Sequence, residues 1–98
     1  MADEALPGYD LISEGLKDLA LGVESTAALL VSIGAPRLSR IGISVASPIP
    51  HAEHRLYQHL SRAHGDAAHS RFNALVRRLV SFERAAERRA GDNQFRYS

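Results

Sequence analysis

The stretch STAALLVSIG, residues 25–34, decides how this chain folds. It is apolar in most positions and carries no charged side chain. A helix that is apolar on several sides is buried on several sides. Two structures could bury this helix: the shorter helices that follow in the chain, or a second copy of the chain. For the second case, the predicted interface residues are Leu21, Leu29 and Val31.

Toward the N-terminus, this stretch continues a helical pattern that begins near Tyr9. Gly15 and Gly22 interrupt the pattern, and each costs about 1 kcal/mol relative to alanine in a helix. They indicate a kink or a place where another helix comes close. Gly34 and Pro36 supply the stop signal. One long helix over residues 9–33 is therefore predicted from apolar residues at steps of three and four: Ile12, Leu16, Leu19, Val23, Ala27, Leu30 and Ile33.

Downstream of Gly34, the sequence predicts two short helices and a second long one. Pro36 suits the start of the first short helix, and residues 50–64 form the second. Gly65 ends that helix, and Asp66 caps the last helix over residues 67–90. The prediction is an all-α fold, a small helical bundle. Two long antiparallel helices enclose the two shorter ones, and the bundle is expected to be dimeric.

The bulk properties indicate one domain and exclude several classes of protein. The 98 residues divide into an N-terminal tail (1–8), a domain (9–91) and a polar C-terminal tail (92–98). The absence of cysteine excludes disulfides and thiolate metal sites. No apolar run is long enough to span a membrane, and no signal peptide is recognisable. We expect a soluble cytoplasmic protein without a cofactor.

Charge changes sign along the chain. Residues 1–35 sum to −5, whereas residues 36–98 sum to +6 and hold all eleven arginines. Such asymmetry can mark a nucleic-acid-binding face, or two halves that pair with each other or with a second copy. Pairing is the favoured interpretation. The residues predicted to pair with carboxylates or phosphates form two stripes on the last helix, one on each flank of its apolar face: Arg77, Arg84 and Arg88, and Arg71, Arg78 and Arg89.

Glu83 is the least expected residue of the last helix, because it falls in the middle of the apolar face. A buried carboxylate has to pair, become protonated or face a partner. A structural ion pair with Arg37 or Arg40 is the favoured prediction. The alternative is a catalytic carboxylate or metal ligand beside His64 or His69.

All five histidines lie between residues 51 and 69. His51 and His54 stand one helical turn apart and form a weak candidate metal site, since an H-x-x-H spacing alone is unspecific. They are more simply exposed helix residues. His69 is expected to be buried and hydrogen-bonded at the edge of the core.

One catalytic hypothesis rests on Arg62 and His69, which six residues separate. This spacing resembles the R-x(4–6)-H signature of the all-helical HEPN ribonucleases in that count alone. Gly65, a helix breaker, and Ala63 depart from the family's pattern. The resemblance implies a metal-independent ribonuclease that uses Arg62 and His69.

The sequence favours a non-catalytic helical interaction or assembly protein, acting as a homodimer or as a subunit of a larger complex. Its partner would be itself or another protein, and no membrane is involved. The two alternatives are the ribonuclease and a basic protein that binds nucleic acid through the arginine stripes. Little aromatic character accompanies those arginines, so base stacking is unsupported.

Overall fold

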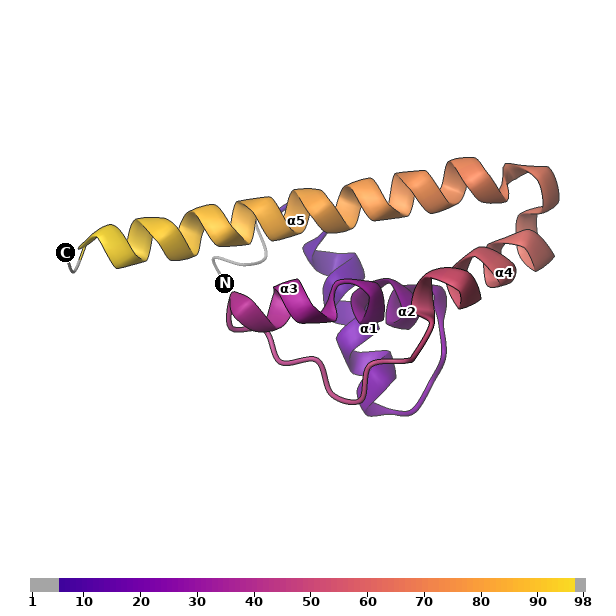
Figure 1. The fold of residues 1–98 in the computed structure, drawn as a ribbon, viewed down its shortest axis with the longest axis horizontal. Helices are drawn as coiled ribbons and strands as arrows, with labels where there is room; N and C mark the ends of the chain where they lie inside the picture. Colours follow the sequence, from indigo (N-terminus) through magenta and orange to yellow (C-terminus); the bar gives the residue numbers. More distant parts are fainter. Residues whose placement is uncertain (1–5, 97–98) are drawn as a thin grey trace.

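A computed structural model describes residues 6–96 as helices joined by short loops (Figure 1). This part of the chain contains no strand, which confirms the all-α class. A single 3-10 turn, Gly65–Ala67, joins the last two helices. The helices are α1 (Tyr9–Ala20), α2 (Thr26–Ile33), α3 (Ala35–Arg40), α4 (Ala52–His64) and α5 (Ala68–Arg96).

Helix α2 is the centre of the fold. It contacts α1, α3, α4 and α5. The side chains of Leu29, Leu30 and Val31 are fully buried, and an apolar helix with neighbours on all sides needs no polar face. Of the two predicted alternatives, the structure therefore shows α2 buried by the other helices of the same chain. Two predicted dimer contacts, Leu29 and Val31, lie inside the chain.

The predicted single helix over residues 9–33 is wrong, because the chain breaks between α1 and α2. Gly22 adopts φ +74, a left-handed conformation that glycine tolerates best. The Val23 amide donates to the Asp18 carbonyl oxygen at 2.8 Å, and the Gly22 amide to that of Leu19 at 3.0 Å. This pair of bonds is the Schellman motif that ends helices. Ser25 then starts α2, since its Oγ accepts a hydrogen bond from the Ala28 amide at 3.1 Å.

Gly15 marks the close approach of two helices. It is buried in α1, and a methyl group there would run into the carbonyl oxygen of Ala27 and lie 2.8 Å from Cγ1 of Val31. Only glycine lets α2 lie this near to α1. Of the two glycines in the predicted helix, one is thus a packing site and the other a break.

The arrangement of two long antiparallel helices is also corrected, since α5 is the only long helix in the described residues. It lies along one edge of the molecule, and α1 runs across its direction (Figure 1). Helix α4 packs against α5 and joins it through the Gly65–Ala67 corner. The backbone of α5 continues to Arg96, beyond the predicted end at residue 90. Residues 1–5 and 97–98 of the predicted tails lie outside the described residues.

The loop between α3 and α4 is fastened to α2 through Ser32, a buried polar residue. Its Oγ donates to the Ala28 carbonyl oxygen at 2.8 Å and accepts from the Ile49 amide at 3.0 Å. Ile43, Val45 and Ile49 of the same loop pack against the core. This loop is therefore part of the packed structure.

Candidate interaction surface

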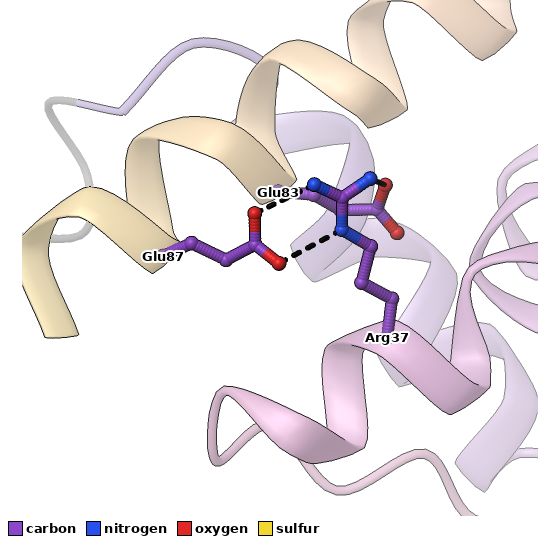
Figure 2. Close-up of polar contacts among 3 residues, drawn as sticks. All are labelled: Arg37, Glu83 and Glu87. Carbon is purple, nitrogen blue, oxygen red and sulfur yellow. Dashed lines mark hydrogen bonds and ion pairs between the residues drawn. The ribbon is translucent and has the colours of Figure 1, made fainter. Parts of the chain in front are cut away.

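Glu83 is 3% exposed and is paired with Arg37, as the favoured prediction proposed. An Arg37 Nη1 lies 3.6 Å from Oε1 of Glu83. The same guanidinium donates two shorter hydrogen bonds to Glu87, from Nε at 2.9 Å and from Nη2 at 2.6 Å. Figure 2 shows the Arg37 side chain rising from α3 to meet both carboxylates of α5. One arginine thus clamps α3 to two successive turns of α5.

The electrostatics of this clamp differ between its two carboxylates. Burial raises the pKa of Glu83, while the nearby charge of Arg37 opposes that rise and the charge of Glu87 adds to it. The hydrogen bonds from Arg37 lower the pKa of Glu87, and those same bonds raise the pKa of Arg37. Glu83 also packs against the backbone of Gly34, where an added methyl group would lie 2.9 Å from its Oε2. This environment is that of a structural contact.

The five histidines do not converge on a site. All five are exposed, and no group of three or more potential metal ligands occurs within the described residues. His51 and His54 border a shallow hollow of about 410 Å³, which Ile33, Pro36 and Ile49 also line. His51 adopts φ +55 where the chain turns into α4.

The prediction that His69 is buried is wrong. The neighbouring Ala68 takes the buried position at the start of α5, and this turns the imidazole outward. Its Nε2 lies 3.2 Å from Nδ2 of Asn73, one turn along α5. Arg62 is exposed as well, on α4, across the Gly65–Ala67 corner from His69. Among the described residues, no hydrogen bond or ion pair joins Arg62 to His69, or Glu83 to a histidine.

Among the described residues, ion pairs join the acidic first part of the chain to the basic second part at two places. Arg55 of α4 donates two hydrogen bonds to Glu24, from Nε at 2.9 Å and from Nη2 at 2.6 Å. These bonds lower the pKa of Glu24. Arg78 of α5 lies 3.5 Å from Oδ1 of Asp10. Asp18 instead accepts a hydrogen bond from Ser25 Oγ at 2.6 Å.

Among the described side chains of α5, four arginines form no ion pair: Arg71, Arg77, Arg84 and Arg88. Glu83 is buried beside Arg37, and Glu87 accepts both short hydrogen bonds from Arg37 while it also interacts electrostatically with Arg84. Arg89 is half-buried and has contacts of its own. We call the exposed set the arginine surface of α5, and it comprises Arg71, Arg77, Arg78, Arg84 and Arg88. Within the described residues, only Arg78 of this set forms an ion pair.

An apolar corner lies where α1 meets α2. Leu21, the third predicted interface residue, is 66% exposed, and Val23 is 48% exposed. They stand at the Schellman turn, next to a hollow of about 180 Å³ bordered by Leu19 and Ile49. Of the three predicted interface residues, only Leu21 is exposed in the structure.

Sequence reasoning missed two contacts, the Arg55–Glu24 pair and the role of Glu87. Glu87 stands four residues after Glu83, one turn along α5, so the helical spacing already placed both on the same side. No local signal pointed to Arg55 and Glu24, because the pair depends on how α4 lies against the start of α2.

Comparison with known proteins adds no relative. No protein-family model matches the sequence, and searches of curated proteins and of solved structures gave no significant match. Within the described part of the chain, no helix is both long and apolar enough to cross a membrane.

Proposed function

We propose that this protein is a non-catalytic interaction protein, which binds an acidic partner through the arginine surface of α5. The observation that carries the proposal is that, among the described side chains of this helix, the acidic ones are paired, whereas most of the exposed arginines are not. Its carboxylates at residues 83 and 87 are both bound by Arg37 of α3, whereas four of the five surface arginines have no ion pair among the described residues. A surface on which positive charge predominates attracts a partner of opposite charge.

The arrangement of the other titratable groups supports a binding role over a catalytic one. The one buried carboxylate among the described residues is held by Arg37, and all five histidines are exposed. A general base or metal site would need such groups to converge in a cleft. Self-association through this surface is disfavoured, since two copies would bring like charges together. The partner is therefore a different molecule.

A photo-crosslinking experiment tests the proposal without assuming the partner's class. A photoreactive amino acid replaces Ser81, which is exposed between the surface arginines, and as a control Ser61, which is exposed on α4. In cells that produce the protein, we expect adducts from position 81 and not from position 61. The adducts should disappear when Arg77→Glu and Arg88→Glu are added. Equal labelling from both positions, or labelling that survives the charge reversal, would contradict the proposal.

A further inference from the structure

The surface arginines of α5 stand in two rows with small residues between them. At 100° per residue, one row contains Arg77, Arg84 and Arg88, and the other contains Arg71 and Arg78. Ala74 and Ser81 lie on the line between the rows and are exposed. A helix with this outer face can approach a flat or grooved partner closely along its centre while its arginines reach out on both sides.

Phosphate is the anion that suits this arrangement best. Arginine binds phosphate oxygens with two parallel hydrogen bonds, and it does so more specifically than lysine. The rise of a helix spaces Arg77, Arg84 and Arg88 by about 10.5 and 6 Å along the axis. The whole surface, from Arg71 to Arg88, is about 25 Å long. It therefore suits a repeating polyanion better than a single small phosphate.

We infer that the arginine surface of α5 binds the major groove of duplex DNA, with the two arginine rows on the phosphates of the two strands. This inference rests on the proposed function and names its partner. The major groove of B-form DNA is about 12 Å wide and admits an α-helix. The major groove of duplex RNA is too narrow and deep for side chains to read.

Single-stranded nucleic acid fits the surface less well. Proteins that bind single strands stack bases on aromatic side chains. The only aromatic residue within the described surface of α5, Phe72, is half-buried and packs against Tyr57, with ring centroids 5.9 Å apart. Ala74 has no polar side-chain group, and the single hydroxyl of Ser81 can bond to any base, so neither residue distinguishes one base from another. The contacts are therefore to phosphates, and binding is expected to depend little on DNA sequence.

The salt dependence of binding gives the first quantitative test. Each neutralised phosphate contributes about −0.9 to the slope of log K against log salt for duplex DNA. Five surface arginines therefore predict a slope of about −4.5. Fluorescence anisotropy with a labelled 20-base-pair DNA duplex, from about 50 to 200 mM salt, should show a several-hundred-fold loss of affinity.

Matched charge-removing variants distinguish this surface from net charge. The pair Arg77→Gln/Arg88→Gln removes two arginines from one row. The pair Arg40→Gln/Arg62→Gln removes two exposed arginines from α3 and α4 and lowers the net charge equally. The first pair should make the slope less steep by about 2, and the second should leave it unchanged. Circular dichroism and thermal melting of both variants check that each is folded.

Three results would overturn the inference. These are no duplex binding at 50 mM salt, an equal loss of affinity in both variant pairs, and equally tight binding of duplex RNA or polyglutamate. If one of them occurs while position 81 still crosslinks to a protein in cells, the proposed function stands and its partner is an acidic protein. If position 81 gives no adduct either, both proposals fail.

Discussion

At the scale of single residues, the guanidinium of Arg37 contacts two carboxylates, those of Glu83 and Glu87, and it binds them unequally. Glu87 receives the two short hydrogen bonds from Arg37, and Glu83 receives only the longer contact at 3.6 Å. Burial of a charge costs free energy unless partners compensate for it. Glu83 is the buried member and the less compensated one, which is why its pKa rises while that of Glu87 falls.

The raised pKa of Glu83 predicts a pH dependence of stability with a definite sign. The folded protein holds the Glu83 proton more tightly than the unfolded chain, so ionisation lowers the free energy of unfolding. The Glu83→Gln variant should match the wild type at acidic pH. It should become the more stable of the two as pH rises through the raised pKa, by about 1.4 kcal/mol for each tenfold difference in proton affinity. Urea unfolding at a series of pH values measures this.

Glu87→Gln provides the opposing control. The pKa of Glu87 is lowered, so its contribution is present above the ordinary carboxylate pKa and fades as pH falls through the lowered one. The wild type should therefore exceed this variant at neutral pH, and the difference should shrink on acidification. If the stability of Glu83→Gln relative to the wild type does not change with pH, the burial-raised pKa is refuted.

At Gly15, the sign of the change in the free energy of unfolding on substitution by alanine distinguishes helix propensity from overpacking. Alanine is favoured over glycine inside a helix by about 1 kcal/mol. The added methyl group, however, would meet the Ala27 backbone and Val31, and overpacking costs about 1–3 kcal/mol. Because a backbone carbonyl cannot rotate away, we expect Gly15→Ala to lower the free energy of unfolding. Denaturant titration decides, and a more stable variant would mean that α2 does not lie this close to α1.

At the scale of elements, the break between α1 and α2 explains why the spacing of apolar residues wrongly predicted one helix over residues 9–33. Both helices turn apolar residues to the same core, so the spacing of three and four continues across the gap. The signals for the break were local: Gly22 at a helix end and Ser25 three residues later, a residue type that starts helices. Residues that end or start helices identify a boundary between two helices. The spacing of apolar residues does not identify it, since that spacing indicates only which side of a helix is buried.

Ser25 joins the two helices and should be measurable as a cap. Its Oγ accepts from the Ala28 amide and donates to Asp18 Oδ2. Ser25→Ala should reduce the free energy of unfolding by about 1 kcal/mol. Ser25→Thr keeps a hydroxyl at the cap and should restore most of the loss. Ser44→Ala, at an exposed loop position, should change little. Equal stability of Ser25→Ala and Ser44→Ala in denaturant titration would argue against the cap.

The charge layout of α5 could be predicted only in part. Helical spacing placed the arginines on two flanks and Glu83 on the apolar face, because both follow from position along the helix. Whether an arginine finds a carboxylate depends instead on where the acidic residues of α1 and of the turn before α2 come to lie. Glu24 lies beside Arg55 of α4, and Asp18 is bonded to Ser25, so neither reaches α5. The unpaired surface therefore emerges only from the tertiary arrangement.

At the scale of the whole molecule, the question is what buries the apolar helix α2. Its apolar character was compatible with burial by a second copy or by the chain's own helices. The contacts of α2 with α1, α3, α4 and α5 supply that burial within one chain. The same residues that suggested a dimer, Leu29 and Val31, are fully buried. The described core is therefore covered by helices of the same chain.

A core closed within one chain predicts unfolding that does not depend on protein concentration. A protein that folds only as a dimer becomes more stable as concentration rises, because association is linked to folding. Here the melting temperature should stay constant over about a hundredfold range of concentration, and native mass spectrometry should give the mass of a single chain. Leu29→Ala should lower stability by about 2–5 kcal/mol through a cavity in the core, again without concentration dependence. A melting temperature that rises with concentration would show instead that a second copy completes the fold, with the exposed Leu21 and Val23 as the first residues to test.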